Sequence, residues 1–190
     1  MPSAFTLIRS AIATAAFVAA AEALATDSAS ADRRKLDTFI VGANGDEGDL
    51  VAAHVGLEYT AAPRLGITVA PQLSVSRAQN TQDDTVAIVA ADIQLRWYGL
   101  RAGRLASFIE AGAGAQYTGQ RSFPASGTHF NFRLRAGLGA RVAVTPRWEV
   151  LSGYNWLHMS NGNALTPNVG HDGPMYFIGA TYSLGAQARH

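Results

Sequence analysis

The chain has 190 residues, enough for one domain, and its 15 basic and 14 acidic residues leave a net charge of +1. That balance gives no electrostatic reason to expect binding to nucleic acid. The sequence contains no cysteine, which excludes disulfide bonds and zinc–thiolate sites. After the N-terminus, no apolar run is long enough for a transmembrane helix.

The first 25 residues have the pattern of a secretory signal peptide. Arg9 supplies the positive charge, residues 11–21 form a short apolar core, and Ala23-Leu24-Ala25 fits a small-x-small cleavage site. An amphipathic helix is the alternative, but this segment has no polar face. We therefore expect a signal peptide over residues 1–25, a flexible polar leader over 26–35 and one domain over 36–190.

From about Leu36 onward, apolar and polar residues alternate with the period of two that is typical of β-strands. No helical pattern intervenes. The segment 129–144 shows the alternation best, because its apolar side chains fall on one face and Arg133, Arg135 and Arg141 on the other. The predicted strands are 36–44, 50–59, 66–76, 85–98, 106–118, 129–144, 148–160 and 174–184.

An even number of strands with one apolar and one polar face fits a barrel that crosses a membrane. In a soluble sandwich, the same arginines would face water. A narrow barrel of eight strands must be filled by side chains, and charges buried there need partners. We therefore predict an all-β fold, an eight-stranded antiparallel transmembrane β-barrel with a plugged polar lumen. The charges expected to face inward are Glu58, Asp92, Glu110, Glu149, Arg96, Arg133, Arg135 and Arg141.

The connections and the aromatic residues predict how the barrel sits in the membrane. We expect short turns near 60–65, 99–105 and 145–147 on the periplasmic side. The links near 45–49, 77–84, 119–128 and 161–173 should face outside. Aromatic residues mark membrane interfaces, and the sequence places such residues near both ends of the strands. They are Tyr59, Trp97, Trp148 and Tyr182 on one side, and Tyr117, Tyr154, Trp156 and Tyr176 on the other.

The candidate chemistry lies in the stretch from Trp156 to Asp172. His158 and Ser160 are two residues apart, so on a strand they share a face. Asp172 follows twelve residues after the serine, where the chain could return on a neighbouring strand. This is the pattern of a serine nucleophile with a base and an orienting acid. His171 is a competing base, which we expect to lie on the loop surface.

The apolar members of the same strands place His158, Ser160 and Asp172 on the lipid-facing side of the outer rim. Polar groups in that position are costly unless they have a function. The alternative is a polar strand end that runs into a loop rich in glycine and asparagine.

The run His158-Met159-Ser160-Asn161, followed by Pro167-Asn168-Val169-Gly170, resembles the signature of the PagL-type lipid A 3-O-deacylases of the Gram-negative outer membrane. The resemblance implies ester hydrolysis without a metal and Asn168 as an oxyanion donor. Asn161 could be a second polar support, or it could shape the loop through an Asx turn. The family's acid is usually a glutamate, so Asp172 is a departure.

We therefore predict a serine esterase of the bacterial outer membrane that hydrolyses the 3-O-linked acyl chain of lipid A in lipopolysaccharide. Ser160 would be the nucleophile, His158 the base and Asp172 the acid that orients it. No metal or other cofactor and no nucleic acid is expected. Two alternatives stay open. One is a non-catalytic small barrel for adhesion or envelope integrity, and the other is a phospholipase or an acyltransferase of the outer membrane.

Overall fold

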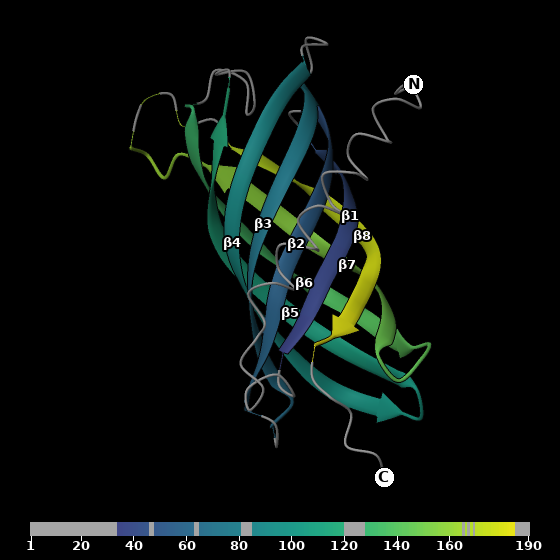
Figure 1. Cartoon of the computed structure of the whole chain (residues 1–190). Helices are drawn as coiled ribbons and strands as arrows, with labels where there is room; N and C mark the ends of the chain where they lie inside the picture. Colours follow the sequence, from purple (N-terminus) through teal and green to yellow (C-terminus); the bar gives the residue numbers. More distant parts are fainter. Residues whose placement is uncertain are drawn as a thin grey trace.

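The computed structural model describes residues 34–45, 48–62, 65–80, 85–119, 128–164, 166, 168 and 170–184. Every strand in it pairs antiparallel with its neighbours in the chain, and the first strand also pairs with the last, so the sheet closes into a barrel (Figure 1). The strands are β1 (Arg34–Gly45), β2 (Gly48–Ala62), β3 (Ile67–Asn80), β4 (Thr85–Ala102), β5 (Leu105–Thr118), β6 (Phe130–Ala143), β7 (Trp148–Ser160) and β8 (His171–Ser183). The predicted eight-stranded antiparallel barrel is confirmed.

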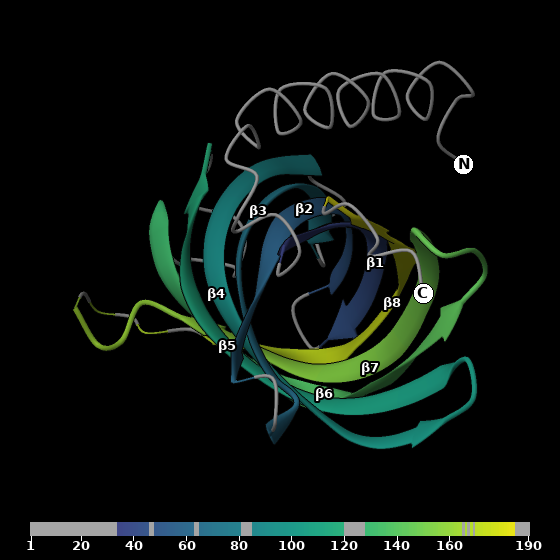
Figure 2. The same ribbon diagram turned by 60° about the horizontal axis from the view of Figure 1, so that its bottom comes forward.

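Seen towards one end, the strands surround a single lumen (Figure 2). The connections β1–β2, β3–β4, β5–β6 and β7–β8 lie at one end of the barrel, and the other three connections lie at the opposite end. The predicted signal peptide, residues 1–25, lies outside the described residues. No helix in the described part of the chain has the length and apolar character needed to cross a membrane.

Several strand boundaries differ from the prediction by one to four residues, and two of the differences affect the predicted domain limits or the candidate site. β1 begins at Arg34, inside the predicted leader, and β8 begins at His171, three residues before the predicted start at Pro174. Proline is usually confined to strand edges and ends, and the predicted strand starts at Pro174. Here Pro174 is the fourth residue of β8 and lies opposite Trp156 of β7. The earlier start matters, because it includes Asp172 in the strand.

The two faces of each strand separate apolar from charged side chains, as the alternation predicted. In β4, Val89 and Ile93 point outward and are 57% and 60% exposed, while Asp92 and Arg96 point inward and are 5% and 2% exposed. The outward face therefore carries the apolar surface that a membrane-spanning barrel presents to lipid.

A network of buried charges fills part of the lumen. Arg96 lies at its centre: Nε donates to Glu110 Oε2 at 2.7 Å, and Nη1 donates to Glu58 Oε2 at 2.9 Å and to Asp37. Arg141 adds two bonds to the Glu58 carboxylate, at 2.9 and 3.0 Å. The predicted inward charges thus pair with one another, and Asp37 joins them although the sequence did not single it out.

The remaining predicted charges also face the lumen. Arg133 and Arg135 approach Asp92 at 3.6 and 3.9 Å, and Glu149 pairs with Lys35 at 2.7 Å. Ion pairs between side chains of different strands therefore cross the interior of the barrel and stabilise it.

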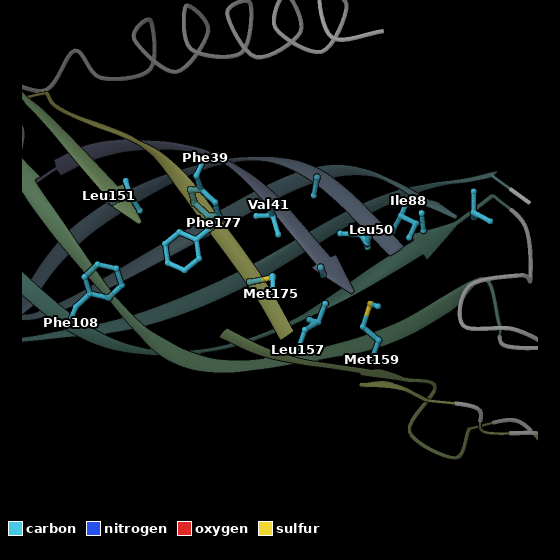
Figure 3. Packing of buried hydrophobic residues seen from close by; sticks show 14 of the residues in the cluster. Phe39, Val41, Leu50, Ile88, Phe108, Leu151, Leu157, Met159, Met175 and Phe177 are labelled. Carbon is cyan, nitrogen blue, oxygen red and sulfur yellow. The ribbon is translucent and has the colours of Figure 1, made fainter. Parts of the chain in front are cut away.

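Apolar side chains fill other parts of the lumen (Figure 3). The ring of Phe177 lies between those of Phe39 and Phe108, with centroid distances of 5.6 and 6.4 Å. The cluster continues through Val41, Leu50, Ile88, Leu151, Leu157, Met159 and Met175. The lumen is plugged as predicted, but it is polar only in part. The prediction named only the charged inward residues, yet several strands also turn large apolar side chains inward, such as Phe39, Leu157 and Phe177.

Candidate active site

The structure brings His158, Ser160 and Asp172 together in one chain of contacts. The Nδ1 of His158 lies 2.9 Å from Asp172 Oδ1, and its Nε2 lies 3.2 Å from Ser160 Oγ. A carboxylate can only accept, so Nδ1 carries the proton and Nε2 can accept from the serine hydroxyl. Both distances are within the reach that proton transfer requires. This order of groups is that of a nucleophile, a base and an orienting acid.

Strand pairing fixes these positions. His158 and Ser160 are two residues apart at the end of β7, and Asp172 lies directly opposite His158 on β8. Directly opposed residues on antiparallel strands have Cβ atoms only about 4.5–5.5 Å apart. The short aspartate side chain therefore reaches the imidazole without a bend in the chain.

The site faces away from the lumen. The side chains of His158 and Asp172 are 40% and 44% exposed. On β6, Leu134 lies opposite His158 and Phe132 lies opposite Ser160, and both are about half exposed on the outer face. The site therefore lies on the outer wall of the barrel, at the end that carries the β7–β8 connection.

A tight turn follows Ser160. The amide of Ala164 donates to the carbonyl of Asn161 at 3.2 Å, and the two residues between them have positive φ, 65° for Gly162 and 63° for Asn163. Two successive positive φ values are typical of a type I′ turn, in which glycine and asparagine are favoured. A Cβ on Gly162 would lie 3.2 Å from the ring of Phe132, so the turn passes close over the residue beside the serine.

The side chain of Asn168 braces this turn. Its Oδ1 accepts from the backbone N–H of Asn161 at 3.0 Å, and its Nδ2 donates to Asn163 Oδ1 at 2.9 Å. Asn161 is itself 2% exposed. Both predicted supporting residues thus lie in the loop next to Ser160, and each is held within the loop by a hydrogen bond. The described part of the motif ends with Gly170, where a Cβ would lie 3.6 Å from His158 Cε1.

The structure does not place His171 on the loop surface, so that prediction is wrong. His171 is the first residue of β8, is fully buried, and points to the face opposite to Asp172. Gly45 leaves room for it, since a Cβ there would collide with the imidazole ring. The expectation failed because β8 starts at His171, three residues before the predicted start, which includes His171 in the strand. The burial of His171 leaves His158 as the histidine beside the serine.

One contact was not foreseen. Trp156 was expected only as an interfacial aromatic residue, yet its indole Nε1 lies 3.3 Å from Asp172 Oδ1. Trp156 precedes His158 by two residues on the same strand, so the sequence already predicted that both side chains face outward. The contact of Trp156 with the acid was not predicted, because that depends on the register between β7 and β8.

Comparisons with known proteins place the chain in a family. A family model described as lipid A 3-O-deacylase (PagL) matches residues 53–183, well over half of the chain and all of the strands that carry the site. A comparison with curated proteins found no match.

Solved structures that resemble the chain include barrels of the outer membrane. The crystal structure of the outer membrane enzyme PagL has a TM-score of 0.64 at 17% identity and covers 77% of this chain and 98% of that one. Neisserial surface protein A gives 0.56 at 13% identity, with 79% and 95% covered. OprG from Pseudomonas aeruginosa gives 0.52 at 12% identity, with 81% and 97% covered. At these identities the structural likeness shows the fold alone.

Proposed function

This chain belongs to the PagL family of lipid A 3-O-deacylases, which are carboxylic ester hydrolases of the outer membrane, and we propose that it uses Ser160, His158 and Asp172 to remove the 3-O-linked acyl chain of lipid A. The observation that carries the proposal is the position of His158, within hydrogen-bond reach of both Ser160 Oγ and Asp172 Oδ1 on the outer wall of the barrel. This position supports a substrate that lies in the membrane beside the protein.

The reaction begins at Ser160. Its Oγ attacks the carbonyl carbon of the ester at the 3-position while His158 Nε2 takes the hydroxyl proton. The carbonyl oxygen becomes an oxyanion, and its collapse breaks the bond to the sugar oxygen. His158 gives its proton to that oxygen, which leaves as the sugar hydroxyl. A water molecule, deprotonated by the same nitrogen, then attacks the carbonyl carbon of the serine ester. The bond to Ser160 Oγ breaks, the proton returns from Nε2 to that oxygen, and the fatty acid is released.

Asp172 orients the base and stabilises its charged form. By accepting from Nδ1, the carboxylate leaves Nε2 free to accept the serine proton, and it offsets the positive charge that the imidazole gains. The 2.9 Å separation supports this role.

Asn168 and Asn161 support the site through the loop. Asn168 uses one amide hydrogen to hold Asn163 and its oxygen to hold Asn161. An amide group has a second hydrogen, with which Asn168 would act as the oxyanion donor. One such donor contributes roughly 10²–10³-fold to the rate. We assign Asn161 to the shape of the turn rather than to the chemistry, because its backbone is the point that Asn168 holds.

Mass spectrometry of lipid A from cells with and without the protein tests the function. We expect the loss of one 3-hydroxyacyl chain, with no change in phospholipids. The gain of a chain would indicate transfer, and a change in phospholipids alone would indicate a phospholipase. Unchanged lipids despite folded protein would favour a non-catalytic barrel and contradict the proposal.

A further inference from the structure

The indole of Trp156 and the imidazole of His158 contact the same carboxylate oxygen. Nε1 of Trp156 lies 3.3 Å from Asp172 Oδ1, and Nδ1 of His158 lies 2.9 Å from it. We propose that Trp156 is a positioning residue that holds the Asp172 carboxylate in place for His158. This inference rests on the proposed function, in which Asp172 orients the base.

The strand register explains why only a long side chain could do this. Trp156 lies opposite Pro174, and His158 lies opposite Asp172. Trp156 is therefore the diagonal neighbour of the acid, and diagonal neighbours on antiparallel strands are about 7–8 Å apart. An indole bridges that separation with its ring and places its N–H at the carboxylate.

The chemistry of the indole suits the task. It can donate one hydrogen bond and cannot accept one, so it does not compete with the carboxylate for the imidazole proton. It also has no charge, so it does not neutralise the carboxylate that must stabilise the imidazolium. At a lipid-facing rim a carboxylate needs donors, because apolar surroundings hydrate it poorly. The indole supplies one from the apolar side.

Exposure alone does not distinguish Trp156 from the other tryptophans. Trp97, Trp148 and Trp156 are 49%, 48% and 49% exposed, as expected for aromatic residues at a membrane surface. The contacts differ: the ring of Trp148 lies against Tyr182, with centroids 4.8 Å apart, whereas the indole N–H of Trp156 is directed at a carboxylate. Trp148 is therefore a matched control.

The test replaces Trp156 by phenylalanine, which keeps an aromatic ring at the lipid surface and removes the N–H. We expect kcat for deacylation in detergent to fall about ten-fold, as for the loss of one hydrogen bond, with KM unchanged. Trp148→Phe should keep the wild-type kcat. In an Asp172→Asn background, Trp156→Phe should have no further effect, since it acts through the acid.

A spectroscopic measurement tests the contact independently of activity. The chain has three tryptophans, so ¹⁵N-labelled indoles give three N–H signals in detergent, and the signal missing from the Trp156→Phe variant identifies Trp156. Asp172→Asn should shift that signal and leave the other two in place.

Two outcomes would overturn the inference while leaving the triad intact. One is a Trp156→Phe variant with wild-type kcat beside a slow Asp172→Asn variant. The other is a Trp156 signal that Asp172→Asn does not move. An Asp172→Asn enzyme as fast as wild type would instead refute the role of the acid in the proposed function, and the inference with it.

Discussion

Asp172 depends for its proposed role on the strand that carries it. An aspartate is one methylene shorter than the glutamate usual in the family, so the sequence left open how it would reach the imidazole. The structure answers this through the register, which sets Asp172 directly across from His158 at the start of β8. If the same residue lay on a loop, no strand pairing would hold its carboxylate opposite His158.

We predict that Asp172→Asn lowers the deacylation rate by about 10²–10⁴-fold, because the amide cannot stabilise the imidazolium or select its tautomer. Asp172→Glu should stay active, since it keeps the charge. Release of 3-hydroxy fatty acid by purified variants in detergent measures both. A heat-dependent shift in gel mobility shows that each barrel is folded. An asparagine variant with the wild-type rate would mean that some other group orients His158.

The residues of the site differ in how far the sequence could predict them. His158 and Ser160 are two apart on one strand, so their common face followed from the period of two. The contact of Trp156 with Asp172 needed the register between β7 and β8, which sequence alternation alone does not supply. His171 was misplaced for another reason: β8 starts three residues earlier than predicted, so His171 belongs to the strand and not to the loop.

At the scale of elements, the β7–β8 loop shapes the surroundings of Ser160. Its turn needs two residues with positive φ, and Gly162 is the one that also approaches Phe132. The hydrogen bonds of Asn168 then hold the turn against the end of β7. The family motif indicated that this loop contributes to the site. It did not indicate that the side chain of Asn168 forms hydrogen bonds to two other residues of the same loop.

We predict that Gly162→Ala lowers the deacylation rate by about ten-fold or more, because a left-handed backbone costs a residue with a Cβ roughly 1–2 kcal/mol and small displacements at a site are expensive in rate. Gly103→Ala is the control. Gly103 also has a positive φ, 58°, but lies in the β4–β5 turn with nothing within 4 Å of its Cβ position. The specific activity of folded protein is the measurement. Equal effects of the two changes would show that strain in a turn, rather than its place beside Ser160, matters.

At the scale of the whole molecule, the barrel is a scaffold whose interior and exterior have separate tasks. Charged residues and aromatic rings fill the lumen, whereas the candidate site lies on the outer wall. The strand count, the two faces and most inward charges were predictable, because alternation reports them directly. The apolar part of the lumen was not, because buried residues such as Val41, Leu157 and Met175 are as apolar as residues that face lipid. Asp37 shares the inward face of β1 with Lys35, so the same alternation could have found it.

We predict that Arg96→Met destabilises the barrel by about 3–5 kcal/mol, because it leaves buried carboxylates without the cation that lies between them. Glu110, Glu58 and Asp37 all contact this guanidinium. Arg104→Met, at the exposed β4–β5 turn, should change the stability by less than about 0.5 kcal/mol. Urea unfolding of barrels refolded into lipid vesicles measures both. Equal stability of the Arg96→Met variant and the wild type would show that the network contributes nothing net.

The most direct test of the account compares two serines of β7. Ser152 and Ser160 both point outward, but Ser152 Oγ donates to the carbonyl of Phe177, while Ser160 Oγ contacts His158. The measurement is the release of 3-hydroxy fatty acid from lipopolysaccharide by purified, folded Ser160→Ala and Ser152→Ala variants. We predict no release above background for Ser160→Ala and the wild-type rate for Ser152→Ala. Release at the wild-type rate by folded Ser160→Ala would contradict the assignment of the nucleophile.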